Sequence, residues 1–373
     1  MNITLDGGAK MRLIPIQCVK ENTRLAKSIY DNDGKVLLKK GSTLTGKIIK
    51  KIKELNIYSI YIFDEYSNKI IEEIIKPEIR QKAIMAIKKS FMNINPCDTH
   101  KKINYVDKEN EFNSILYIAK ELIEEVLSKK DVMINLVDIK SKNNYIFQHS
   151  VNVAIISLII GIKLNLHKFD LMDLCIGALL HDIGMIFVPV EILNKESELT
   201  KQEYDIVKQH TKKGYDFLRE CFDISVTSIM VVLQHHEKIG GQGYPEGKSG
   251  DEISKFGKIV AIADTYDALT AHRPYRKAMS PNEALEYLMA SGGIQFDYKY
   301  VQVFSQIVVP YPEGTLVNLT NGEKAIIEKI SHNFPLRPKV KIIYSNDKKR
   351  INKIIELEKQ LNIVIKDISY EKI

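Results

Sequence analysis

The sequence predicts a mainly α protein: a central all-helical domain between a small N-terminal α/β module and a small C-terminal β module. Three observations predict this class. Apolar residues recur at helical spacing over residues 69–308, capping boxes start helices inside that range, and both ends of the chain carry strand patterns with turn signals. A chain of 373 residues with 45% apolar residues can form two or three domains with cores.

The N-terminal module is predicted to span residues 1–68. Residues 12–16 form a strand pattern, and Asn32-Asp33-Gly34 is a hairpin turn between strands at 26–30 and 36–38. Thr45 is placed to cap a helix, and a strand pattern follows at 58–63. This module has no cluster of ionisable side chains, so we interpret it as a regulatory or interaction module.

Residues 69–124 are highly charged and show helical periodicity, so they are predicted to form a helical connector. Its helices are candidates for a homodimer contact. The stretch 93–107, which contains Asn95-Pro96, interrupts the helical pattern.

The central domain is predicted over residues 125–308. Thr200 with Glu203 and Ser280 with Glu283 have the spacing of capping boxes that start two helices. The apolar run 151–162 is too short to span a bilayer and is typical of a core helix.

The C-terminal module is predicted over residues 309–373. A hairpin joins strand patterns at 315–320 and 324–330 through Asn321-Gly322, and a third strand covers 339–344. This pattern predicts a small β-rich module whose function the sequence leaves open.

Charge and cysteine usage favour a cytoplasmic protein that neither binds nucleic acid nor inserts into a membrane. The net charge is +7, but the basic residues are spread along the chain, which is typical of solvated surfaces. The four cysteines form no CxxC pair, and no secretory signal precedes the first module.

The strongest chemical pattern is a set of seven potential metal ligands between residues 149 and 264. They are His149, His181, Asp182, His210, His235, His236 and Asp264. Each pair alone could be a chance occurrence, with the side chains satisfied in a core or exposed at a surface. Together they exceed what one divalent metal needs, and a pair of metals is a standard device for phosphodiester hydrolysis. The pattern therefore predicts a two-metal phosphodiesterase site.

Five motifs run through the same region. They are Phe147–Ala154 (FQHSVNVA), His181-Asp182-Ile183-Gly184, His235-His236-Glu237 with Gly241-Gln242-Gly243-Tyr244-Pro245, Ile262–Thr270 (IADTYDALT), and Arg273-Pro274-Tyr275-Arg276. In this order, over about residues 125–308, they resemble the HD-GYP family of the HD metal-dependent phosphohydrolase superfamily. The resemblance implies an all-helical domain that hydrolyses the bacterial second messenger cyclic di-GMP to linear pGpG, with GMP as a further product left open. It also implies diguanylate cyclase (GGDEF) domains as partners.

The resemblance further implies two divalent transition-metal ions. Fe or Mn is the expected metal, and Zn, Co or Ni are the alternatives. Carried over by position, one ion is held by His149, His181, Asp182 and Asp264, and the other by His210, His235 and His236, with Asp182 bridging. The two ions would activate a water for in-line attack on phosphorus. Tyr244 is expected to contact the substrate, and Arg273 and Arg276 to bind its phosphates with forked donors. The alternative for the arginine pair is a helix-end salt bridge.

Three positions depart from the family pattern: Met185, Tyr145 and Gly240, which stands where the family commonly has an acidic residue before the Gly-x-Gly-Tyr-Pro loop. Met185 occupies the place of the lysine that usually follows His-Asp-Ile-Gly, so a weakened module that binds cyclic di-GMP as a sensor is an alternative to the enzyme. A second alternative, an HD phosphohydrolase for another nucleotide, is disfavoured by the intact Gly243-Tyr244-Pro245 loop. Tyr145 lies four residues before His149, where members with three metals have a glutamate, so two metals are expected.

Overall fold

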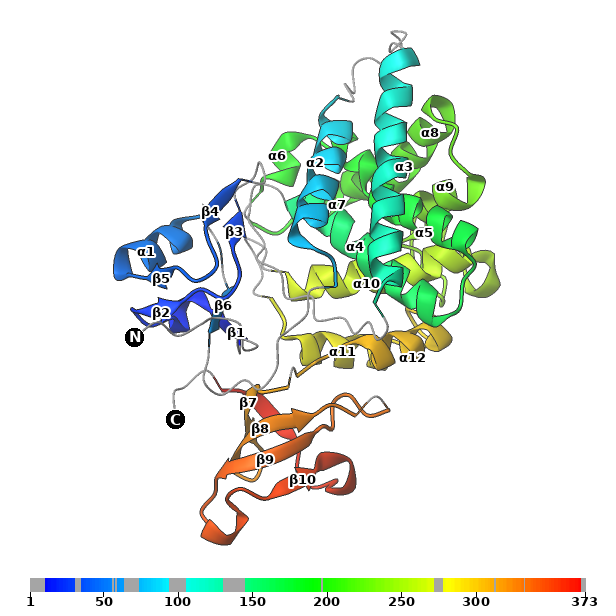
Figure 1. Cartoon of the computed structure of the whole chain (residues 1–373). Helices are drawn as coiled ribbons and strands as arrows, with labels where there is room; N and C mark the ends of the chain where they lie inside the picture. The colour runs from blue at the N-terminus through cyan, green and yellow to red at the C-terminus, as the bar shows by residue number, and fades with distance from the viewer. Residues whose placement is uncertain are drawn as a thin grey trace.

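The computed structural model describes residues 11–30, 35–55, 57, 59–63, 74–93, 105–129, 145–195, 197–271, 278–311, 313–331 and 333–369. Across these residues the chain is mainly helical, which confirms the predicted fold class (Figure 1). Short strands of an N-terminal module come first, a bundle of helices follows, and a β-sheet forms the C-terminal part.

The N-terminal module has short strands that pair two by two beside one helix. Its elements are β1 (Met11–Pro15), η1 (Ile16–Cys18), β2 (Thr23–Arg24), β3 (Ile29–Tyr30), β4 (Val36–Leu38), β5 (Thr43–Leu44), α1 (Gly46–Glu54) and β6 (Ser59–Phe63). β1 pairs antiparallel with β6, β2 with β5, and β3 with β4. The last pair confirms the predicted hairpin, although its turn at Asn32-Asp33-Gly34 lies outside the described residues. Thr45 caps α1 as predicted, because its hydroxyl accepts from the backbone N–H of Ile48.

The helical bundle contains most of the described residues. Its elements are α2 (Pro77–Asn93), α3 (Tyr105–Leu127), α4 (Tyr145–Lys163), α5 (Lys168–Leu180), η4 (Ile183–Phe187), α6 (Val190–Leu193), α7 (Lys201–Lys208), α8 (His210–Cys221), α9 (Val226–Gln234), η5 (Gly250–Glu252), α10 (Lys255–Thr270), α11 (Pro281–Ala290) and α12 (Tyr298–Ile307). Thr200 with Glu203 and Ser280 with Glu283 form complete capping boxes at the starts of α7 and α11, as predicted.

One hydrophobic core runs through this bundle. Ile84 and Ile87 of α2 and Leu122 of α3 belong to it together with Val153 of α4 and Leu179 of α5. The two helices that the sequence assigned to a connector therefore pack into the bundle itself, as Figure 1 also shows. The domain boundaries near residues 68, 124 and 308 stay a prediction.

Helix α4 is apolar on all sides because other helices surround it. Its window Ile146–Lys163 is long and apolar enough to cross a membrane, but 72% of that window is buried inside the fold. A helix with apolar residues on every side is found in protein cores as well as in membranes. Burial by the neighbouring helices therefore explains the composition of α4.

The C-terminal module is an antiparallel sheet with strand order β10-β9-β8-β7-β11. Its elements are β7 (Leu316–Leu319), β8 (Lys324–Lys329), β9 (Lys339–Tyr344), η6 (Lys348–Arg350), β10 (Ile354–Glu356), η7 (Leu357–Lys359) and β11 (Ile365–Ile368). The hairpin and the third strand were predicted, whereas β10 and β11 were not. Both of these are short edge strands that contain charged residues, so their sequences carry little strand signal.

Candidate metal centre

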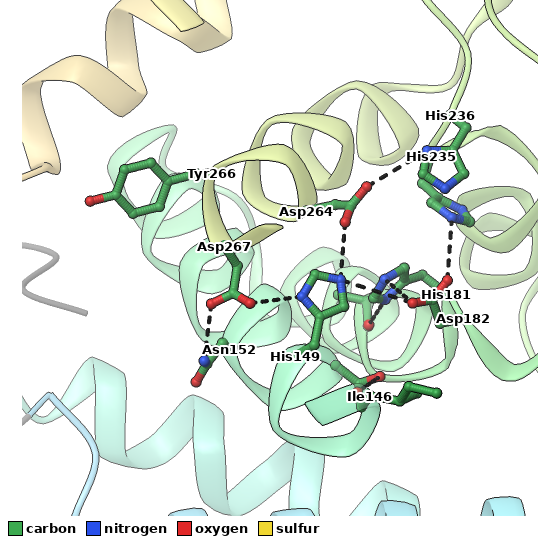
Figure 2. Close-up of polar contacts among 12 residues, drawn as sticks. Ile146, His149, Asn152, His181, Asp182, His235, His236, Asp264, Tyr266 and Asp267 are labelled. Carbon is green, nitrogen blue, oxygen red and sulfur yellow. Dashed lines mark hydrogen bonds and ion pairs between the residues drawn. The ribbon is translucent and has the colours of Figure 1, made fainter. Parts of the chain in front are cut away.

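The structure brings all seven predicted ligands together where five helices meet. They form two groups whose donor atoms lie within 4.8 Å of one another: His149, His181 and Asp264 in the first, and Asp182, His210, His235 and His236 in the second. His149 and Asp264 project from α4 and α10, as predicted, and the other five lie at helix ends. Figure 2 shows six of the seven, all except His210, pointing toward a common centre.

Helix ends explain how three of the imidazoles are oriented. Nδ1 of His181 donates to the carbonyl oxygen of Ala178 at 2.8 Å, Nδ1 of His210 to that of Val207 at 2.7 Å, and Nδ1 of His235 to that of Val232 at 3.0 Å. The last carbonyls of a helix have no partner further along the helix, so they are free to accept these bonds. Because a carbonyl cannot donate, the proton of each neutral ring lies on Nδ1 and the Nε2 lone pair faces the centre.

The inward lone pairs fit a bound cation. Nε2 of His210 and Nε2 of His235 lie 3.3 Å apart, and in rings whose single proton is on Nδ1 neither of these atoms has a proton to share. Nε2 of His181 is buried and has no hydrogen-bond partner among the described residues. Burial, with neighbouring His236, lowers the pKa of His235 well below its usual value, so this ring is neutral at physiological pH. Buried nitrogen and carboxylate donors without protons are the ligands that divalent metals need, and the cluster is able to bind metal.

Asp182 lies between the two groups. Its Oδ1 is 3.4 Å from Nε2 of His210, while its Oδ2 is 3.4 Å from Nε2 of His181. Burial acts to raise the pKa of Asp182, but the charges of the nearby imidazoles, His181 first, outweigh it, and the pKa lies well below the usual value. An ionised carboxylate with one oxygen toward each group has the geometry expected of a bridging ligand.

His149 is held from its outer side. Its Nδ1 donates to Oδ2 of Asp267 at 2.7 Å, and its Nε2 lies 3.0 Å from Oδ1 of Asp264 (Figure 2). Asp267, three residues after Asp264 on the same helix, thus orients the His149 ring from outside the set of predicted ligands. Sequence reasoning missed Asn152, which donates to Oδ1 of Asp267 at 3.0 Å. Its position three residues after His149 on the same helix face was an available signal.

Gly184 allows the second group to form. A Cβ at this position would overlap the carbonyl oxygen of His210 and approach the backbone of Gly214 in α8. Glycine after the His181-Asp182 pair therefore lets η4 pack directly on α8, which places His210 beside Asp182.

Comparison with known proteins agrees with this geometry. Residues 131–299 match the family model described as HD domain, and residues 316–372 match the one described as KOW domain associated with HD domain. The cyclic di-GMP phosphodiesterase PA4108 of Pseudomonas aeruginosa is 34% identical over 231 residues, which cover 61% of this chain and 56% of that protein. The HD domain of this chain is of the HD-GYP type.

Two further relatives of the HD-GYP domain differ in the substrate that their names state. The cyclic di-GMP phosphodiesterase PdeB of Borreliella burgdorferi is 29% identical over 209 residues, covering 56% of this chain and 55% of the relative. The 3'3'-cGAMP-specific phosphodiesterase 1 of Vibrio cholerae is 37% identical over 166 residues, covering 44% of this chain and 38% of the relative. The chain spans about half the length, or less, of these curated relatives.

The Gly-Tyr-Pro loop of the HD-GYP domain lies against the second group of ligands. The ring of Tyr244 is 4.7 Å from that of His236, and its backbone N–H donates to the His236 carbonyl at 3.2 Å. Gly243 permits this approach, because a Cβ there would overlap the backbone of Glu237. Gly241 has a different role: its φ of +78° favours glycine, while its neighbours lie at ordinary contact distance.

Met185 leaves the HD-GYP site without a cation at the position after His-Asp-Ile-Gly. It lies half-buried in η4, and its backbone N–H donates to the Asp182 carbonyl at 2.9 Å. Arg273 and Arg276 lie outside the described residues, as does the side chain of Tyr145.

Proposed function

We propose that this chain is a metal-dependent phosphodiesterase that hydrolyses cyclic di-GMP. The observation that carries the proposal is the pair of donor groups that share Asp182, since two adjacent cation sites suit in-line displacement at phosphorus. The names of the relatives support cyclic dinucleotides as the substrate class. Cyclic di-GMP is the substrate in two of those three names, so we propose it first, with linear pGpG as the product.

Each donor group is proposed to hold one divalent ion, with Fe or Mn as the expected metals. His149, His181 and Asp264 would hold the first and His210, His235 and His236 the second, with Asp182 shared. Ions bound there supply Lewis acidity for the attack of water on the phosphodiester.

The remaining residues act on the substrate directly. Burial, with the nearby charge of Tyr204, raises the pKa of Tyr244, so its hydroxyl stays protonated and can donate to a phosphate oxygen. Arg273 and Arg276 are proposed to bind the phosphates, because a guanidinium offers paired donors to two phosphate oxygens.

A product assay tests this proposal. Protein stripped with a chelator and reloaded with Mn²⁺ or Fe²⁺ is incubated with cyclic di-GMP, and in parallel with 3'3'-cGAMP, and the products are separated by chromatography. We expect pGpG only in the loaded samples. Hydrolysis of 3'3'-cGAMP alone would contradict the proposed substrate, and loaded protein that neither binds nor cleaves either dinucleotide would contradict the function.

A second candidate is a cyclic di-GMP sensor with little turnover. Met185 favours it, because a thioether carries no charge toward the phosphate. In the same assay a sensor would retain intact cyclic di-GMP on the protein.

We extend the proposal to location and partners. The enzyme would act in the cytoplasm, where GGDEF domains produce its substrate. Exposed apolar side chains on the outer helices, Met92 of α2 and Tyr117 of α3, support a homodimer through these helices. Light scattering of the wild type and of Met92→Glu would test that contact.

A further inference from the structure

A row of hydrogen bonds leads from the metal centre across the bundle to helix α2. His149 and Asn152 of α4 donate to the two carboxylate oxygens of Asp267 in α10, at 2.7 and 3.0 Å (Figure 2). Arg80 of α2 donates from Nη1 to the side-chain oxygen of Asn152 at 2.6 Å. Arg80 is thereby joined to a predicted metal ligand through two side chains.

The chemistry of these side chains fixes which group donates and which accepts in each hydrogen bond of the row. A guanidinium can only donate and an ionised carboxylate can only accept, so the amide of Asn152 must present its oxygen to Arg80 and its nitrogen to Asp267. Without Arg80, nothing in this row would select that orientation of the amide. Linked bonds of this kind polarise one another, so the charge of Arg80 strengthens the bond from Asn152 to Asp267.

Burial makes the row important for the position of His149. Asp267 is 1% exposed, Asn152 2% and His149 3%. A buried carboxylate is costly unless donors and a compensating charge surround it. Arg80 supplies donors and positive charge from the edge of the buried region, and through Asn152 this helps to hold the Asp267 carboxylate in place beside the His149 ring.

We propose that Arg80 is a positioning residue of the metal centre, acting on His149 through Asn152 and Asp267. The inference rests on the metal centre of the proposed function and does not depend on the substrate. Arg80 lies before residues 131–299, which match the HD domain, so part of the support for the ligands comes from outside that domain. Ile84 and Ile87 anchor α2 in the common core, which holds Arg80 against α4.

Metal titration of the full chain tests the proposal without any substrate. Chelator-stripped protein is titrated with Co²⁺, and the two stepwise dissociation constants are followed by calorimetry and by the visible spectrum of the bound ion. Arg80→Met removes the donors and keeps a long side chain. We expect the Kd of one ion to rise roughly fivefold to tenfold, at or below the usual effect of losing an outer hydrogen-bond partner of a ligand. The other Kd should change less than twofold.

Three further variants separate positioning from general loosening. Arg80→Lys keeps the charge and one donor, so it should restore part of the affinity. Lys82→Met is the matched control on the same helix, because it breaks the 3.5 Å ion pair with Glu121 and leaves the row intact. Arg80→Met should add nothing in an Asn152→Leu background, since the connection is already broken there.

The outcomes that overturn the proposal are distinct from failure of the proposed function. Unchanged Kd values in Arg80→Met, or equal weakening in Lys82→Met, would refute positioning by Arg80. Should Arg80→Met not fold, Arg80→Gln and Arg80→Lys give the same comparison. A wild type that binds no Co²⁺ would refute the metal centre itself, and metal binding without hydrolysis would refute only the proposed activity.

Discussion

The Nε2 atoms of His210 and His235 lie 3.3 Å apart with their lone pairs toward each other. Their Nδ1 protons are committed to backbone carbonyls of α7 and α9, so neutral rings cannot relieve the repulsion by exchanging donor and acceptor. The fold therefore holds two donors in an arrangement that a cation stabilises. From this relationship we expect the stability of the helical bundle to depend on metal.

We first predict that chelation lowers the thermal stability of the bundle and that Mn²⁺ restores it. At a metal concentration of 100 times Kd, linkage gives about 2.7 kcal/mol of stabilisation. The measurement is the melting temperature from far-UV circular dichroism with and without chelator. Magnesium at the same concentration is the control, since it prefers oxygen ligands and should have little effect. Equal melting temperatures in all samples would argue against a metal centre.

The metal-free protein should lose stability as the pH falls below about 6.5. Burial lowers the folded-state pKa of His235 and of His236, so these groups take up protons in the unfolded chain before they do in the folded one. Their contribution is present above the unfolded pKa and is lost at lower pH. His181 opposes them in part, because the charge of Asp182 outweighs burial and raises the His181 pKa.

Urea unfolding of the chelator-treated, metal-free protein at pH 7 and pH 5 measures this dependence. We expect the free energy of unfolding to be roughly 1–2 kcal/mol lower at pH 5. His167→Gln is the control, since His167 is exposed and should leave the difference unchanged. A higher free energy of unfolding at pH 5 than at pH 7 would show that the raised pKa of His181 has a larger effect than the lowered pKa values of His235 and His236.

Asp182→Asn should lower the content of both metals, whereas Asp264→Asn should mainly affect one. The reason is that the oxygens of Asp182 lie equally close, at 3.4 Å, to an imidazole of each group, whereas Asp264 lies 3.0 Å from His149 and 3.7 Å from His236 of the other group. Metal content per chain is measured by elemental analysis after gel filtration. Asp216→Asn, which removes an exposed partner of Lys212, is the control and should keep full metal content. A full content in folded Asp182→Asn would rule out bridging.

The sequence was sufficient to predict which potential ligands the structure brings together, because their residue types and order are specific. Helix ends at His181, capping boxes and the apolar helices around His149 and Asp264 all follow from local patterns that the structure keeps. Local patterns also identified the C-terminal hairpin, in which strand and turn signals agree.

The contacts that support the ligands required three-dimensional packing. Arg80 is 69 residues before His149, and no spacing or motif connects it with Asn152. Gly184 belongs to the recognised motif, but its contact with α8 becomes visible only when the two helices are placed. The same limit applies to β10 and β11, whose short charged sequences become strands through pairing with β9 and β7.

Helix α2 should be required for a stable metal domain. A fragment of residues 74–311 retains Ile84, Ile87 and Phe91 in the core, while a fragment of residues 110–311 removes them. We expect the longer fragment to bind metal with nearly full affinity and the shorter one to be destabilised by several kcal/mol, as large core deletions are. Urea unfolding and metal titration of both fragments check this. Equal stability of the two would show that α2 is a detachable connector.

Met185→Lys should raise kcat. Hydrolysis of a phosphodiester builds negative charge on the phosphoryl and leaving oxygens, and a cation aimed there is worth a few kcal/mol. Met185 supplies only packing from its half-buried position in η4. Because the new interaction would form mainly in the transition state, kcat should rise by about tenfold and KM should change less. Steady-state hydrolysis of cyclic di-GMP by metal-loaded protein measures both, and Met185→Leu controls for packing.

Another cation could already occupy that role. Lys208 forms an ion pair with Asp205 at 2.6 Å, and its Nζ lies 5.1 Å from the ring of Tyr204. The ring of Tyr204 is in turn 6.5 Å from that of Tyr244 at the metal centre. If Lys208 supplies the charge, Lys208→Met should lower kcat in the wild type but much less in the Met185→Lys background. A folded Met185→Lys with unchanged metal content and equal or lower kcat would show that the site does not lack a cation. The Lys208→Met result would then show whether this residue provides it.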